Sequence, residues 1–155
     1  MSMTTAAVLG MGAWGTTFAQ VLADAGVDVT MWGRNTDTIS FINGRENPTY
    51  LPGITLSERI TATTDIAEVV AGKPLVVVAV PVKAVRATLE AARASFVPDV
   101  ALLSLAKGLE LGTLKRVDEI IADASGVPHS RIAVLSGPNL SREIAERQPT
   151  ATVVA

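Results

Sequence analysis

Short apolar segments and amphipathic segments alternate along the whole chain, and this alternation restricts the fold more than any other feature. Runs rich in Val, Leu and Ala recur at residues 6–9, 28–32, 75–80, 100–105, 131–135 and 151–155. None of them alternates strictly with polar residues, so both faces of each strand are expected to be covered, as in a parallel sheet. Helical patterns occupy residues 14–24, 36–43, 64–71, 82–96, 113–124 and 139–147. The alternation predicts an α/β fold: a doubly wound, mostly parallel Rossmann sheet with helices on both faces.

The composition fits one domain over residues 1–155. Of the 155 residues, 48% are hydrophobic and 4% aromatic, which is typical of a sheet packed with aliphatic side chains. Thirteen basic residues against fifteen acidic ones give a net charge of −2, so we expect no nucleic-acid surface. There is no cysteine for a disulfide or a thiolate metal site, and no cluster of metal ligands can be assembled. The longest apolar runs fall far short of the roughly 20 residues that span a membrane, so we expect a cytoplasmic protein without a membrane span.

A glycine-rich turn follows the first predicted strand and opens the first predicted helix. Gly10, Gly12 and Gly15 form the pattern G-x-G-x-x-G in the context that a dinucleotide-binding turn requires. Gly10 allows the tight turn, Gly12 lets a pyrophosphate approach the backbone, and Gly15 lets the helix lie close to the strand. Ala13 keeps a backbone N–H for the anion, and the Trp14 ring is expected to cover the ligand. Binding of a nicotinamide dinucleotide is therefore predicted; a turn without a ligand and a core role for Trp14 are the alternatives.

The end of the second strand bears on which dinucleotide is bound. An acidic residue about 20 positions beyond the turn would bind the ribose hydroxyls and favour NAD. The strand ends instead in Trp32, Gly33, Arg34 and Asn35. Arg34 can neutralise a 2′-phosphate and stack beside the adenine. We therefore place Arg34 and Asn35 at the coenzyme and expect a preference for NADP(H), or dual use of NADP(H) and NAD(H); a solvated arginine is the alternative.

Four segments in order carry a resemblance to a known family: residues 10–17 (GMGAWGTT), 47–53 (NPTYLPG), 106–110 (AKGLE) and 136–139 (SGPN). The set resembles the motifs of the NAD(P)-dependent sn-glycerol-3-phosphate dehydrogenases of bacteria. The resemblance implies reversible hydride transfer between the coenzyme and C2 of glycerol 3-phosphate, which interconverts it with dihydroxyacetone phosphate for phospholipid synthesis. It implies that Lys107 contacts coenzyme and substrate and that Gly137 and Asn139 contact the substrate. It also implies that Tyr50 and Ser141 lie by the coenzyme.

The chemistry of these residues agrees with such roles. Lys107 and Gly137 follow predicted strands, at the edge where open α/β sheets bind ligands. The Lys107 ammonium could hold a phosphate or polarise a carbonyl, with a solvated lysine as the alternative, and Asn139 could equally cap the next helix. Residues 80–82 lie at the same edge, where a ligand contact and a plain first helical turn both fit the sequence. The basic residues of the following helix are interpreted as solvated surface: Lys83, Arg86 and Arg93.

Some family features are altered or missing. Ala13 stands where many members have Ser, and Asn139 replaces a more usual small hydroxyl residue. The family's general base is a lysine of a helical second domain, to which no part of this chain corresponds. The apolar run at residues 151–155 suggests truncation. We therefore expect a coenzyme-binding domain without a catalytic residue of its own, inactive in isolation.

Two other assignments stay open at this point. Another NAD(P)-dependent reductase of the 6-phosphogluconate dehydrogenase-like superfamily would share the glycine turn but not the segments at 47–53 and 106–110. A non-catalytic module that senses NAD(P) would need a signalling surface, and neither a DNA-binding helix pair nor a basic stripe is visible in the sequence. An exposed apolar edge at the C-terminal side is expected to favour self-association, for example as a homodimer.

Overall fold

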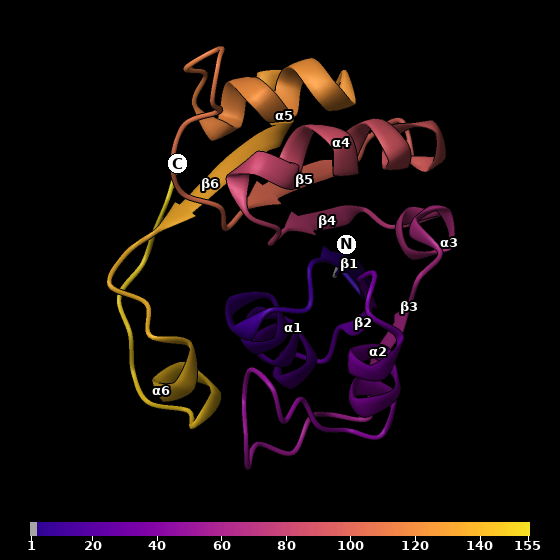
Figure 1. Cartoon of the computed structure of the whole chain (residues 1–155), viewed down its shortest axis with the longest axis vertical. Helices are drawn as coiled ribbons and strands as arrows, with labels where there is room; N and C mark the ends of the chain where they lie inside the picture. Colours follow the sequence, from indigo (N-terminus) through magenta and orange to yellow (C-terminus); the bar gives the residue numbers. More distant parts are fainter. Residues whose placement is uncertain (1–2) are drawn as a thin grey trace.

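The computed structural model describes residues 3–155, so residues 1 and 2 of the predicted domain lie outside the described residues. Seven strands form one sheet in the order β3-β2-β1-β4-β5-β6-β7. Their bounds are Thr5–Leu9 (β1), Asp28–Trp32 (β2), Ile60–Thr63 (β3), Leu75–Val78 (β4), Ala101–Ser104 (β5), Ile132–Ser136 (β6) and Val153–Val154 (β7). Strands β1 to β6 run parallel, and β7 pairs antiparallel with β6. The predicted mostly parallel, doubly wound sheet is confirmed (Figure 1).

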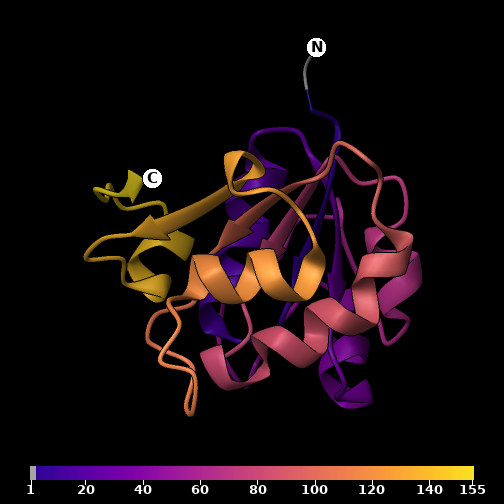
Figure 2. The same cartoon turned by 90° about the horizontal axis from the view of Figure 1, so that it is seen from above.

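Six α-helices connect the described strands and cover both faces of the sheet. Their bounds are Ala13–Asp24 (α1), Thr36–Asn43 (α2), Ile66–Val70 (α3), Val82–Ala92 (α4), Val117–Ser125 (α5) and Ser141–Ala145 (α6). Helices α4 and α5 lie side by side on one face, and α1 and α2 lie on the other (Figures 1 and 2). None of the helices within residues 3–155 is long and apolar enough to cross a membrane.

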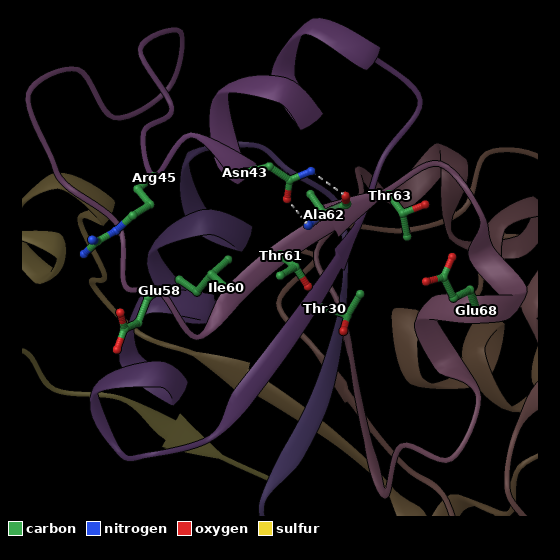
Figure 3. Close-up of a pocket in the computed structure, with 9 residues that line it drawn as sticks. All are labelled: Thr30, Asn43, Arg45, Glu58, Ile60, Thr61, Ala62, Thr63 and Glu68. Carbon is green, nitrogen blue, oxygen red and sulfur yellow. Dashed lines mark hydrogen bonds between the residues drawn. The ribbon is translucent and has the colours of Figure 1, made fainter.

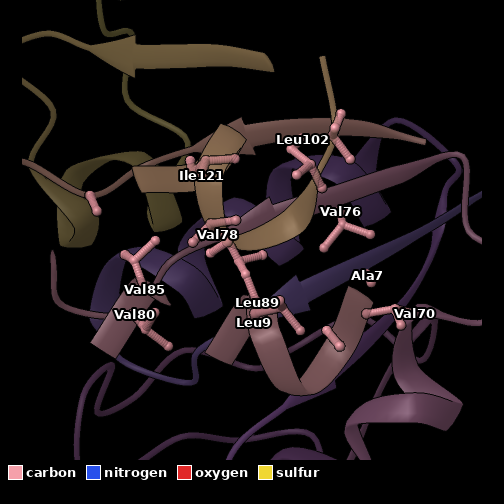
Figure 4. Packing of buried hydrophobic residues seen from close by; sticks show 14 of the residues in the cluster. Ala7, Leu9, Val70, Val76, Val78, Val80, Val85, Leu89, Leu102 and Ile121 are labelled. Carbon is pink, nitrogen blue, oxygen red and sulfur yellow. The ribbon is translucent and has the colours of Figure 1, made fainter. Parts of the chain in front are cut away.

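Strand β1 lies in the middle of the core, and its side chains alternate between the two faces. Ala7 and Leu9 pack into a cluster with residues of α4 and α5, including Leu89 and Ile121 (Figure 4). Ala6 and Val8 pack into the second cluster, which holds buried residues of α1 and α2. All four β1 side chains are fully buried. A strand with period-two side chains can therefore be apolar throughout, because helices cover both faces.

The predicted elements differ from the structure in a few places. No strand was predicted between residues 32 and 75, but β3 occupies Ile60–Thr63 at the sheet edge. Its sequence, ITAT, contains only two apolar residues, too few for a clear apolar run. The helix predicted at 113–124 begins only at Val117, because Leu114 has a positive φ of 57° and lies in a loop. The helix predicted at 82–96 ends at Ala92 and continues as a short 3-10 turn, Arg93–Ser95.

Candidate functional site

A cavity of about 580 Å³ opens at the carboxyl ends of β1 and β4. Strands β2 and β3 lie on one side of β1, and β4 to β7 lie on the other, so the strand order reverses between β1 and β4. Open α/β sheets bind ligands at such a switch point. The lining residues are Gly10, Met11, Gly12, Trp14, Trp32, Gly33, Arg34, Asn35, Thr38, Tyr50, Ala79, Val80, Pro81, Leu105 and Ala106.

The glycine turn forms one wall of this cavity, and its three glycines meet different demands. Gly10 has a φ of +121°, and a Cβ there would lie 2.7 Å from the carbonyl oxygen of Ala79. A Cβ on Gly15 would lie 2.3 Å from the carbonyl oxygen of Gly10, so the helix can approach the strand only without a side chain. A Cβ on Gly12 would meet no atom within 4 Å. Gly12 therefore borders open space, as expected where a ligand approaches the backbone.

Helix α1 begins at this turn with unpaired donors. Gly12 is the N-cap residue, without a capping side chain, and no acidic residue occupies the first turn. The first hydrogen bond of the helix runs from the N–H of Thr16 to the carbonyl oxygen of Gly12, at 2.9 Å. The N–H groups of Ala13, Trp14 and Gly15 precede it and have no acceptor within the helix. This arrangement of free N–H groups, helix dipole and open space suits an anion.

Three aromatic side chains line the cavity. The Trp14 ring meets Phe18 edge-on, with 5.8 Å between ring centroids, and remains half-buried. Trp32 donates from its indole N–H to the carbonyl oxygen of Thr64 at 2.9 Å. Tyr50 is 49% exposed. The cavity thus has flat apolar walls on which planar rings of a ligand can rest.

Arg34 and Asn35 follow β2 and line the cavity as the sequence predicts. Arg34 is exposed. Asn35 is the N-cap of α2, and its side-chain oxygen accepts a hydrogen bond from the N–H of Thr38 at 2.9 Å. The Asn35 oxygen is therefore engaged in capping, whereas no ion pair within residues 3–155 engages the exposed Arg34 guanidinium at the rim.

Asn47 is the polar residue that the sequence analysis did not single out for the site. Its side chain is fully buried, and its Nδ2 donates to the carbonyl oxygen of Met11 at 3.1 Å and to Thr16 Oγ1 at 2.9 Å. These bonds join residues 36 and 31 positions apart. The only sequence signal was its place in the segment NPTYLPG, which does not show what its side chain contacts.

The residues expected at the substrate gather beyond β5 and β6 and do not line the cavity. Lys107 is exposed and donates from Nζ to the carbonyl oxygen of Gly137 at 3.2 Å. Asn139 does not cap α6, whose N-cap is Leu140; its side chain bonds Thr150 and Thr152 instead. The capping alternative is therefore wrong, because the segment before β7 supplies the partners of the Asn139 amide.

The remaining predicted coenzyme residues do not line the cavity. Ala13 and Gly15 belong to the first turn of α1, next to Gly12 and Trp14 in the sequence. Ser141 opens α6, and its carbonyl oxygen accepts a hydrogen bond from Thr17 Oγ1 of α1 at 3.1 Å. Of the segment at 80–82, Val80 and Pro81 line the cavity.

An ion pair fastens the loop after β5 to α4. Arg86 donates from Nε and Nη2 to the two carboxylate oxygens of Glu110, each at 2.8 Å, and Thr113 Oγ1 donates to Glu110 Oε2 at 2.6 Å. The hydrogen bonds from Arg86 and then Thr113 lower the pKa of the Glu110 carboxyl from 4.5 to about 2. The same contact raises the pKa of the Arg86 guanidinium. The interpretation of Arg86 as solvated surface is therefore wrong, since it helps to anchor the loop that carries Lys107.

A second hollow, of about 590 Å³, lies at the β3 edge of the sheet and not at the carboxyl ends of the strands. Asn43 covers part of this edge: its side chain donates to the carbonyl oxygen of Ala62 at 3.0 Å and accepts from the Ala62 N–H at 2.8 Å (Figure 3). No glycine turn or free helix start lines it. Within residues 3–155, no three His, Asp or Glu side chains lie close enough to hold a metal ion.

Comparison with known proteins identifies the family and agrees with the fold. A family model described as the N-terminus of NAD-dependent glycerol-3-phosphate dehydrogenase matches residues 5–155. The chain belongs to this family. The match to the glycerol-3-phosphate dehydrogenase N-terminal domain decides against the alternative of another reductase of the same superfamily.

Relatives and solved structures agree with the assignment to the glycerol-3-phosphate dehydrogenase N-terminal domain. Glycerol-3-phosphate dehydrogenase (NAD(P)+) of Thermobifida fusca is 54% identical over 99% of this chain and 46% of that protein. The Corynebacterium glutamicum protein of the same name is 49% identical over 99% of the chain and 46% of that protein. The crystal structure of glycerol-3-phosphate dehydrogenase from Coxiella burnetii matches with a TM-score of 0.89 and 29% identity, over 98% of this chain and 46% of that one. The chain thus spans about half the length of the curated relatives it matches.

Proposed function

We propose that this domain binds a nicotinamide dinucleotide in the cavity at the glycine turn. The open space at Gly12, beside the free N–H groups that begin α1, is the observation that carries the proposal. The pyrophosphate would bind to the backbone of Gly10, Gly12, Ala13 and Gly15. Trp14 and Tyr50 would flank the coenzyme, while Lys107 and Ser141 would approach it from the neighbouring strand ends.

We further propose that NADP(H) is preferred, or that both coenzymes are used. The family description names NAD and the names of the relatives give NAD(P)+, so together they do not resolve the preference. The cavity lining contains Arg34 and Asn35 at the end of β2 and no carboxylate. A guanidinium at this point can pair with a 2′-phosphate, whereas a carboxylate would favour the free ribose hydroxyls of NAD.

Titration of the chain with NADPH and with NADH tests both proposals. The two tryptophans, Trp14 and Trp32, line the cavity, so quenching of their fluorescence reports binding without a label. We expect tighter binding of NADPH, and loss of that preference in Arg34→Ala through a weaker affinity for NADPH alone. Tighter binding of NADH by the unaltered chain would contradict the preference, and no binding of either coenzyme would contradict the proposed site.

In a protein of the relatives' length, the domain would supply the coenzyme half of a glycerol-3-phosphate dehydrogenase. When bound, the coenzyme exchanges a hydride with C2 of glycerol 3-phosphate or dihydroxyacetone phosphate. The Lys107 ammonium, with donors left beside its bond to Gly137, would hold the substrate phosphate or polarise its carbonyl. Gly137 and Asn139 would complete the substrate contact, and the general base, a lysine, would come from a second, helical domain.

Activity assays distinguish coenzyme binding by this domain from turnover by the full-length protein. The 155-residue chain is expected to bind coenzyme and to produce no NADPH from glycerol 3-phosphate, while the full-length protein turns over. Turnover by the 155-residue chain alone would contradict the placement of the base in a second domain. A cytoplasmic location, a homodimer, and the alternative of a non-catalytic NAD(P)-sensing module stay predictions.

A further inference from the structure

Asn47 combines complete burial with an incompletely satisfied amide. Its Oδ1 is, within residues 3–155, the single buried side-chain nitrogen or oxygen without a hydrogen-bond partner. A buried acceptor without a partner costs stability. An apolar residue at this position would avoid that cost. The hydrogen bonds of the Nδ2 group must therefore explain why position 47 is an asparagine.

The donor half of the amide binds the glycine turn directly. Nδ2 donates to the carbonyl oxygen of Met11, which lies between Gly10 and Gly12, and to Thr16 Oγ1 one helical turn later. Thr16 is itself fully buried and donates to the same Met11 carbonyl at 3.3 Å. Because a peptide unit is planar, a fixed Met11 carbonyl also fixes the direction of the Gly12 N–H.

The backbone of Asn47 reaches a second wall of the cavity. Its carbonyl oxygen accepts hydrogen bonds from the N–H groups of Tyr50, at 3.2 Å, and Leu51, at 2.8 Å. Leu51 is buried and anchors this turn, while Tyr50 lines the cavity. One buried residue therefore joins the turn that faces the cavity to the loop that carries Tyr50.

We propose that Asn47 is a positioning residue of the coenzyme site: its amide orients the glycine turn toward the pyrophosphate, and its backbone holds Tyr50 over the cavity. This inference rests on the proposed coenzyme binding. Asn47 is too deeply buried to touch the coenzyme and acts through Met11, Thr16 and Tyr50.

Comparison of Asn47→Ala with Asn43→Ala distinguishes a loss of positioning at the coenzyme site from a general loss of stability. Asn43 also makes two side-chain hydrogen bonds to backbone, both to Ala62 at the β3 edge (Figure 3). It does not line the cavity at the glycine turn. Dissociation constants for NADPH, ADP and 2′-AMP are measured by tryptophan fluorescence below the melting transition of each variant. Loss of one or two hydrogen bonds that hold the turn predicts a dissociation constant raised about tenfold for NADPH and ADP in Asn47→Ala. The ligand without a pyrophosphate, 2′-AMP, keeps its affinity, and Asn43→Ala lowers Tm but alters none of the three constants.

A second pair of variants decides the matter if Asn47→Ala does not fold. Thr16→Val removes the hydroxyl that joins Asn47 to the turn and keeps the shape of the side chain, while Thr16→Ser keeps the hydroxyl. The proposal is supported if Thr16→Val loses affinity for ADP and Thr16→Ser keeps the affinity of the unaltered chain. Unchanged binding in a folded Asn47→Ala, or an equal loss for all three ligands, overturns it. Failure of the unaltered chain to bind any of them instead overturns the proposed function, and this inference falls with it.

Discussion

Gly12 and Gly15 are three positions apart, yet a side chain would meet open space at the first and a backbone oxygen at the second. Gly12 has a φ of −71°, which alanine adopts without strain, so Gly12→Ala is expected to change the unfolding free energy by less than about 0.5 kcal/mol. The added methyl group would occupy the space proposed for the pyrophosphate and weaken NADPH binding. Chemical denaturation and coenzyme titration of the same sample measure the two effects.

Gly15→Ala provides the opposite case on the same turn. Its methyl group would lie 2.3 Å from the carbonyl oxygen of Gly10, so helix and strand must separate. Overpacking of this kind typically costs about 1–3 kcal/mol of stability. Equal stability losses in the two variants would contradict the assignment of Gly12 to ligand access and Gly15 to packing.

Which site residues could be predicted depended on whether their role is local. Gly10 and Gly12 lie in one turn and Arg34 lies at a strand end, so sequence position sufficed to predict that they border the cavity. Asn47 and Trp32 act through partners about 30 residues away, at Thr16 and Thr64. No local pattern encodes such contacts, and they became visible only in the folded chain.

The loop between β5 and α5 carries the pH dependence that this structure predicts most directly. The pKa of Glu110 is about 2 in the folded chain against an ordinary value of 4.5, because Arg86 and Thr113 hold the ionised carboxylate. Since the folded-state pKa is the lower one, this stabilisation is complete above about pH 4.5 and is lost as the pH falls toward about 2. Glu110→Gln is therefore expected to lower the unfolding free energy at pH 7, and the difference from the unaltered chain should shrink across this window.

Denaturant unfolding at a series of pH values measures that difference. High salt should reduce it, because Arg86 and Glu110 are partly exposed. Asp28→Asn provides a control, because it removes the ion pair between Asp28 and Arg59. The Asp28 carboxyl is more exposed than that of Glu110, so its loss should have a smaller effect on the unfolding free energy. A difference for Glu110→Gln that is constant from pH 7 to pH 2 would contradict the role of the ionised carboxylate.

The same loop explains why one helix was predicted too early. Leu114 continues the apolar spacing of α5 in the sequence, but it lies outside the helix and its side chain is 71% exposed. The helix begins where the N–H of Arg116 can donate to Glu119 Oε2, at 2.8 Å. Apolar periodicity alone cannot distinguish a residue that packs on the core from one that lies exposed in the loop before the helix.

At the scale of the whole molecule, the parallel strands other than β3 were predictable, and so was the apolar run that contains β7, but the direction of β7 was not. The connections from β1 to β6 repeat one unit of strand and helix, and right-handed crossovers leave few ways to arrange such units. Strand β7 follows only the short helix α6 and turns back antiparallel along β6. Its apolar sequence is equally compatible with either direction, so only the pairing with Leu135 and Ser136 distinguishes them.

Exposed apolar side chains lie on the segments that follow β5 and β6, and this predicts self-association. Leu111 is 89% exposed, and Leu140, Val153 and Val154 are also exposed near the end of β6. Burial of such side chains against another copy is favourable in proportion to the area covered. Light scattering at increasing concentration is therefore expected to give a mass above that of one chain. Leu111→Lys should lower that mass, whereas Phe41→Lys, which alters an exposed apolar residue on α2, should leave it unchanged. A strict monomer at high concentration would show that this edge does not bind a second copy.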